Sequence, residues 1–357
     1  VMELNYQGEM SVLPDHALAA VEHALSIDPE MAEAKAWRAE ALKGIGNIGA
    51  AFSAYQEALE TPLINDRTWR ERLTYGMGST AYQLGRYDIA IASAREAITI
   101  APQNAENYKL LAVAFLYSNL FDDSLRAART VLNLNIDNLA NLSWYAEHIT
   151  RLVSKHNAQT SPNFQSQAKQ AIQEAQNALY QAVQLAPHRA DLSVKLSQLQ
   201  QMTGDIASAL DTINSVVNNE NATVEHLIPA AEQLQSLGDP AGAVICLEKA
   251  ITRAHPGNNQ QSLELFTRLA EAYKLKGDLA NATKNYEQAI SLAPNVGQLY
   301  YERTVLLLKL GRTEDAFACV ETGISLARTD PELPRLYILA AWLYRQNNDL
   351  ASALGYI

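Results

Sequence analysis

Small turn residues recur at a regular spacing along almost the whole of this 357-residue chain. The turn positions are Gly46, Gly85, Asn119, Gly204, Gly238, Gly277, Gly311 and Asn348, and the shortest interval between neighbours is 34 residues. The interval of 85 residues between Asn119 and Gly204 contains one further unit and an insertion. A period of this length indicates a repeat protein in which each unit is one supersecondary element.

The residues around each turn position are typical of two short amphipathic helices. A small residue lies five positions after the turn and another lies seven positions before it, as Ala282 and Ala270 do around Gly277. Apolar residues at spacings of three, four and seven favour helices, and small residues let two helices approach closely. Gly or Asn at the turn suits a left-handed backbone conformation. The sequence therefore predicts an all-α chain of about ten helix-turn-helix repeats.

This pattern resembles the tetratricopeptide repeat family over nearly all of the chain. The sharpest unit comprises Phe266, Leu269, Ala270, Tyr273, Gly277, Ala282, Tyr286, Ala289 and Pro294, and a second comprises Gly78, Ala81, Gly85, Tyr87, Ala90, Ala94, Ala97 and Pro102. The resemblance implies one right-handed superhelical α-solenoid over residues 1–357, with partial first and last repeats. Stability is expected to come from stacking, because one helix pair cannot bury its apolar face alone.

Two places depart from the regular rhythm. The fifth repeat, Asp137–Pro187, contains a polar insertion at residues 153–168. We expect a lengthened helix pair with a surface loop there, and the alternative is a loop that contacts a partner. The last repeat begins at Pro331 and stops inside its second helix at Ile357, with no polar capping helix after it. We therefore expect either that the full-length protein continues or that another chain covers this end.

Composition disfavours several classes of function. The net charge is −11 and neither Lys nor Arg forms a run, so a nucleic acid is not the expected partner. No apolar run approaches about 18 residues, so we expect no membrane span. The two cysteines, Cys246 and Cys319, have no CxxC partner, which disfavours a disulfide framework or a zinc site. A cytoplasmic location is expected.

The sequence also lacks the motifs of the common enzyme classes. Its glycines follow the turn period and form no phosphate-binding loop, and no G-x-S-x-G element occurs. The seven histidines have no metal-ligand spacing; a zinc site on a helix would place two of them four residues apart. We therefore expect no catalytic residue, no cofactor and no metal site, and a protein that is not an enzyme.

The resemblance implies that the first helix of each repeat lines the concave groove. Helical spacing then gives the partner-binding candidates, which are Arg72, Tyr75, Ser79, Lys109, Glu147, Gln198, Glu232, Glu271, Tyr301, Trp342 and Arg345. The centre of this groove is acidic and amide-rich, with aromatic and basic residues towards its ends. The expected partner is a protein or peptide segment with basic character, and the expected anchors are Tyr75, Lys109 and Trp342.

Two specialised subfamilies do not match. Co-chaperones that hold a C-terminal carboxylate carry Lys and Asn four residues apart, where this sequence has Ala36/Glu40, Tyr75/Ser79 and Lys109/Val113. The Asn ladder of the glycosyltransferase-type superhelix is also missing, because the equivalent positions begin with Trp37, Gly76 and Leu110.

The leading hypothesis is a non-enzymatic scaffold or adaptor that binds a protein through the concave face of the solenoid. One alternative is the sensor or substrate-recruiting arm of a larger enzyme, with its catalytic domain outside this chain. The other alternative is a structural module that self-associates through its uncapped C-terminal end.

Overall fold

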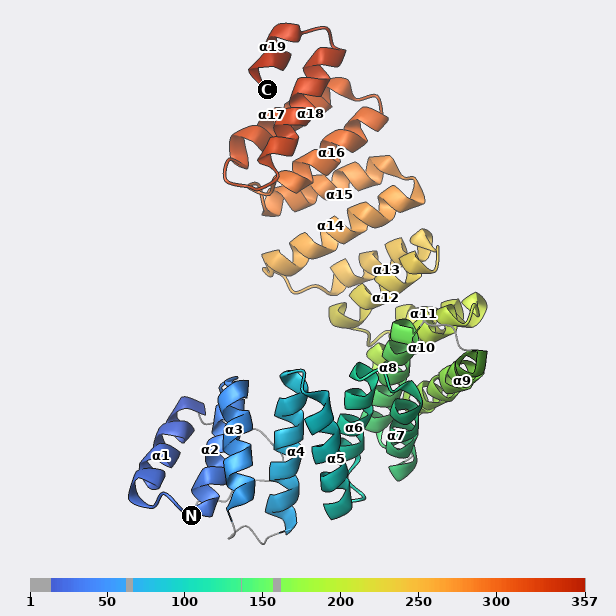
Figure 1. The fold of residues 1–357 in the computed structure, drawn as a ribbon. Coiled ribbons are helices and arrows are strands. Elements are labelled where there is room, and N and C mark those ends of the chain that lie inside the picture. The colour runs from blue at the N-terminus through green and yellow to red at the C-terminus, as the bar shows by residue number, and fades with distance from the viewer. Residues whose placement is uncertain (1–13, 62–66, 136, 157–161, 357) are drawn as a thin grey trace. The chain divides into compact units, whose positions relative to one another are not determined.

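The protein folds as paired α-helices (Figure 1). The computed structural model describes residues 14–61, 67–135, 137–156 and 162–356, and within these ranges it has nineteen α-helices and no strand. The all-α repeat fold predicted from the turn spacing is therefore confirmed. The chain divides into two compact units, unit 1 (Val1–Leu185) and unit 2 (Ala186–Ile357). A single solenoid over residues 1–357 stays a prediction.

Unit 1 is a row of helices in which each helix contacts the next one in sequence. Its helices are α1 (Pro14–Ile27), α2 (Ala32–Gly44), α3 (Ile48–Glu60), α4 (Arg67–Gln83), α5 (Tyr87–Ile100), α6 (Ala105–Tyr117), α7 (Phe121–Leu134), α8 (Leu139–His156) and α9 (Pro162–Leu185). The first helices of its complete repeats are α2, α4, α6 and α8, and contacts join α2 to α4, α4 to α6 and α6 to α8. These four helices form what we call the first-helix face of unit 1.

Unit 2 repeats the same arrangement. Its helices are α10 (Ala190–Met202), α11 (Ile206–Asn218), α12 (Val224–Ser236), α13 (Pro240–Arg253), α14 (Asn259–Lys276), α15 (Leu279–Leu292), α16 (Gly297–Lys309), α17 (Thr313–Leu326), α18 (Leu333–Gln346) and α19 (Leu350–Gly355). The even-numbered helices are the first helices, and each pairs with the odd-numbered helix that follows it.

The turn between the two helices of a repeat depends on backbone stereochemistry. All eight predicted turn residues have a positive φ, for example +87° at Gly277 and +60° at Asn119 and Asn348. A left-handed backbone is unfavourable for side chains with a β-carbon, and Gly and Asn tolerate it best. In several repeats an Asp then caps the second helix, as where Asp278 accepts a hydrogen bond from the Asn281 amide at 3.1 Å.

The small residues on either side of the turn lie at the crossing of the two helices. Ala270 and Ala282 are fully buried, and they share one apolar cluster with Tyr286 and with Leu299 of the next repeat. Each helix pair therefore completes its core only by packing on its neighbour, as expected for a repeat protein.

Part of the predicted insertion is helical. Residues 153–156 form the end of α8, and residues 162–168 belong to the first two turns of α9. Residues 157–161, which carry the rest of the predicted loop, lie outside the described residues.

One buried histidine connects the core of unit 1 to its first-helix face. His148 lies on α8 with 1% of its surface exposed, and its ring stacks on Trp144 at 4.9 Å between centroids. The Ser124 hydroxyl donates to the Ala112 carbonyl at 2.7 Å and lies 2.8 Å from His148 Nε2. Because the hydroxyl proton is already used in the bond to Ala112, Nε2 must be protonated and donate to the Ser124 oxygen. Nδ1 is then the unprotonated ring nitrogen. Among the described residues Nδ1 has no hydrogen-bond partner.

A close approach between helices makes Gly76 sensitive to substitution. A β-carbon built on Gly76 would lie 2.4 Å from ring atoms of Tyr55, which is fully buried. We expect Gly76→Ala to lower the free energy of unfolding by about 1–3 kcal/mol, because the core must shift to accept the methyl group. Urea unfolding followed by circular dichroism measures this change. The control is Gly49→Ala on α3, which meets no atom within 4 Å, and equal stability of the two variants would contradict the packing described here.

The burial of His148 predicts a pH dependence of stability. Desolvation, helped by nearby Arg151, lowers the pKa of His148 from 6.5 to about 4. Between these values the unfolded chain binds more protons than the folded one, so stability is lost as the pH falls from 6.5 towards 4. At pH 4.5 this loss amounts to about 2–3 kcal/mol relative to pH 7. Between pH 7 and pH 4.5 the urea midpoint should fall less in His148→Gln than in the wild type. An equal fall in the two proteins would contradict the assignment of this pH dependence to His148.

Candidate partner-binding surface

Two tryptophans and an arginine form a cluster across the first two helices of the first-helix face of unit 1. Trp37 of α2 and Trp69 of α4 meet edge to face, with ring centroids 5.2 Å apart. The Arg72 guanidinium lies over both rings, 5.3 and 5.6 Å from their centroids, and its Nε donates to Glu40 at 3.1 Å. We call these four residues the tryptophan–arginine cluster. Both rings are half-buried and Arg72 is exposed, so the cluster combines fixed geometry with accessible surface.

The next predicted residue, Tyr75, lies deeper than the arginine. Lys43 of α2 lies over the Tyr75 ring, with Nζ 5.7 Å from the centroid. Burial, with the carboxylates of Glu106 and Glu71 nearby, raises the pKa of Tyr75 to about 12, and burial lowers the pKa of Lys43. Ser79, one turn further along α4, is half-buried. The face therefore continues from the tryptophan–arginine cluster as a row of partly buried polar and aromatic groups.

Lys109 extends this row to α6 and α8. Its Nζ donates to Glu106 at 2.7 Å and lies 5.8 Å from the centroid of the Trp144 ring. Only 12% of the Lys109 side chain is exposed. Glu147, also on α8, forms an ion pair with Arg151 at 3.5 Å. The structure thus brings Arg72, Tyr75 and Lys109 into one continuous face, in which each cation packs on an aromatic ring or pairs with a carboxylate.

The predicted residues at the centre of unit 2 are more exposed than Tyr75, Ser79 and Lys109 of unit 1. Gln198, Glu232 and Glu271 lie on α10, α12 and α14, and all three are exposed. Arg268 donates to Glu232, and its Nη2 lies 2.9 Å from Glu264. A second cross-repeat pair joins Lys274 to Glu302 of α16 at 2.8 Å. The acidic centre predicted from the sequence is therefore partly neutralised by cations of neighbouring first helices.

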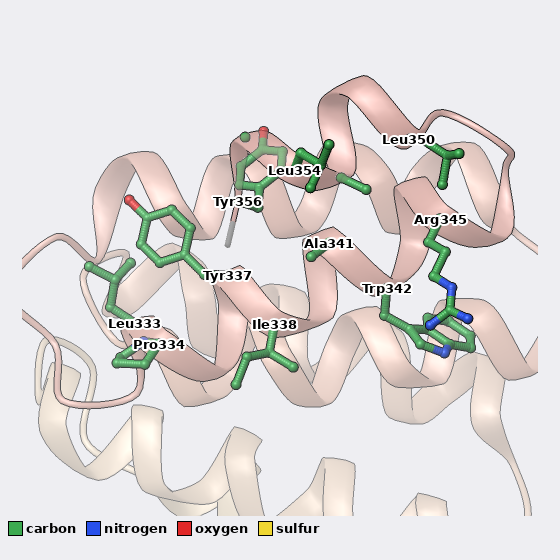
Figure 2. Close-up of a pocket in the computed structure, with 12 residues that line it drawn as sticks. Leu333, Pro334, Tyr337, Ile338, Ala341, Trp342, Arg345, Leu350, Leu354 and Tyr356 are labelled. Carbon is green, nitrogen blue, oxygen red and sulfur yellow. The ribbon is translucent and has the colours of Figure 1, made fainter.

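Of the last three predicted residues, two border an apolar hollow on the final helix pair. Tyr301 is half-buried on α16 beneath Arg335, whose guanidinium lies 5.1 Å from the ring centroid. Trp342 and Arg345 lie together on α18 and line a hollow of about 950 Å³ (Figure 2). We call it the end hollow; its other labelled lining residues are Leu333, Pro334, Tyr337, Ile338, Ala341, Leu350, Leu354 and Tyr356.

Of the residues that line the end hollow, the sequence predictions included only Trp342 and Arg345. The predictions followed only the groove positions of the first helices, so they omitted Leu350 and Leu354 of the second helix α19. A signal for Leu354 was present, because it lies six positions after the turn, where earlier repeats bury Phe52 and Val244. Leu350 had no such signal, because the residues two positions after the earlier turns are half-buried or exposed.

The described residues contain little reactive chemistry. Burial raises the pKa of Cys246 to about 12 and also raises that of Cys319, so both remain protonated thiols at neutral pH. No three His, Cys, Asp or Glu side chains in the described ranges lie close enough to hold a metal ion. None of the described helices is both long and apolar enough to cross a membrane.

Comparison with known proteins identifies the repeats. Residues 72–104, 167–226 and 263–296 match models described as tetratricopeptide repeat, and residues 299–349 match the model of anaphase-promoting complex subunit 5. Mouse tetratricopeptide repeat protein 16 is 25% identical over 391 aligned residues, which cover 95% of this chain and 50% of the mouse protein. The chain therefore spans about half the length of this relative.

Solved structures of other repeat proteins have a similar helical fold. A tetratricopeptide repeat protein from Parabacteroides merdae is 13% identical, with a TM-score of 0.46 over 77% of this chain and 98% of that one. The pilF protein of Pseudomonas aeruginosa is 20% identical, with a TM-score of 0.39 over 66% and 97%. The matched segments and the paired helices with left-handed turns lead to one conclusion: the chain belongs to the tetratricopeptide repeat family.

Proposed function

We propose that this chain is a non-enzymatic scaffold that binds a protein or peptide segment along the first-helix face of unit 1. The tetratricopeptide repeat fold is typical of protein–protein interaction scaffolds. The observation that supports this site is the tryptophan–arginine cluster. Trp, Tyr and Arg provide most of the binding energy at protein interfaces, and side chains that are already held in place lose less entropy on binding.

The pairing of charges favours an apolar or aromatic partner segment over a strongly basic one. A basic partner needs carboxylates that are free to receive it. On this face Glu40 pairs with Arg72, Glu106 pairs with Lys109, and Glu147 pairs with Arg151. Recognition therefore rests on contact with the tryptophans and with Tyr75, and the charged pairs define the polar rim around them.

Substitution of the cluster should weaken binding while the protein remains folded. Peptides can be selected on the wild-type protein from a displayed library of random 16-residue sequences. We expect Arg72→Ala and Trp69→Ala each to weaken binding of the selected peptides at least tenfold, because each removes an anchor of the cluster. Fluorescence anisotropy with labelled peptides measures the affinity, and circular dichroism checks that both variants remain folded.

The matched control is Tyr180→Ala on α9, a second helix. Tyr180 is 61% exposed, so its loss should leave the protein folded. The affinity for the peptides should change by no more than about twofold. The proposal fails if the selected peptides bind Arg72→Ala and Trp69→Ala as tightly as they bind the wild type. It also fails if Tyr180→Ala weakens them equally.

A further inference from the structure

Three repeats carry a glutamate six residues before the turn, and two of these glutamates receive an arginine from the next repeat. Glu40, Glu232 and Glu271 hold this position on α2, α12 and α14. Arg72 of α4 donates to Glu40 at 3.1 Å, and Arg268 of α14 donates to Glu232. In both cases the arginine belongs to the next first helix, so the carboxylate is neutralised from the neighbouring repeat.

Glu271 has no such arginine among the described residues. The next first helix, α16, has Gln298 at the place that Arg72 holds on α4, thirteen residues before its turn. At the place that Arg268 holds on α14, nine residues before its turn, α16 has Glu302. The crossing of α14 and α16 therefore presents a second carboxylate where another crossing presents an arginine.

The charges around Glu271 leave one carboxylate unpaired within the part of the chain that the structure describes. Lys274 donates to Glu302 at 2.8 Å, so this one ammonium is already bound to the other carboxylate. Arg268, one turn before Glu271 on α14, is held by two carboxylates outside this crossing. Glu271 is exposed, so a cation from another molecule can reach it.

A buried tyrosine lies beside the carboxylates of this crossing. The Tyr286 side chain is 1% exposed, and its hydroxyl has no hydrogen-bond partner among the described residues. Burial, with Glu302 and Glu271 nearby, raises the pKa of Tyr286, so the hydroxyl keeps its proton. Burial and nearby Glu40 likewise raise the pKa of Tyr55, the equivalent residue at the crossing that has its own arginine. The two crossings thus share a glutamate and a buried tyrosine, and they differ in the cation.

We propose that a basic side chain of a partner protein binds at Glu271, in the place that Arg72 takes at Glu40. An arginine matches this place best, because a guanidinium can form two parallel hydrogen bonds with one carboxylate. The charge of the occupant follows from the chain's own crossings, in which Glu40 and Glu232 each hold an arginine. The site lies within unit 2 and does not depend on the first-helix face of unit 1.

Selection against an occupied site provides the probe. Peptides from a displayed library of random 16-residue sequences are selected on the wild-type protein, and those that also bind Gln298→Arg are then removed. This variant places an arginine of the chain where Arg72 lies at the first crossing, so it should pair with Glu271. Peptides that bind unit 1 also bind the variant and are removed, so a failure of the scaffold surface proposed for unit 1 is distinguishable from a failure of this site.

The retained peptides should share an arginine or a lysine. Replacing this residue by glutamine should weaken binding at least tenfold in fluorescence anisotropy, and so should Glu271→Gln, because each change removes one half of the ion pair. The matched control is Glu314→Gln, which removes the same charge from an exposed place on α17 and should change the affinity less than twofold. Circular dichroism checks that every variant is folded, and Glu271→Gln replaces Gln298→Arg in the removal step if the latter is not.

A charge exchange tests the ion pair directly. Glu271→Arg should weaken the retained peptides at least tenfold, and peptides with glutamate in place of their basic residue should regain affinity for this variant. The proposal is overturned if no peptide survives the removal step, if the surviving peptides need no basic residue, or if they bind Glu271→Gln as tightly as the wild type.

Discussion

The close crossing of two helices at small residues is the constraint on which the rest of this structure depends. Ala270 and Ala282 have no exposed surface, and Gly76 allows the Tyr55 ring to lie where a β-carbon would otherwise be. Helices that approach this closely leave room only for small side chains at the crossing, and large side chains such as Tyr286 pack together with Leu299 of the next repeat. The core is therefore built from contacts between neighbours, so every pair depends on the next one.

The same constraint positions the candidate surfaces. Because first helices lie beside one another within each unit, side chains about one period apart can meet, as Trp37 and Trp69 do. Ion pairs such as Arg268 with Glu232 follow the same rule across repeats. A surface produced by repetition is long and shallow, so it suits binding through several anchors better than catalysis in an enclosed pocket.

The sequence predicted the fold well because the fold rests on local chemistry. A left-handed turn accepts few residue types, so Gly277 and Asn348 identify it without any knowledge of distant contacts. The cluster around Arg72 could not be predicted in the same way, because the pairing of its guanidinium with two rings depends on how α2 and α4 lie against each other. Charge pairing was missed for the same reason: Glu232 is acidic in the sequence, but Arg268 lies 36 residues away and reaches it only in the fold.

The claim that neighbours hold each helix pair in place can be tested by native-state hydrogen exchange on the free protein. The pair α14–α15 is packed on both sides, whereas α18–α19 has a neighbour on one side among the described residues. We predict that amides of α14 and α15 exchange more slowly than those of α18 and α19, because local opening of the last pair breaks fewer contacts. Equal protection of the two pairs would contradict the account, since it would mean that a helix pair is stable without a second neighbour.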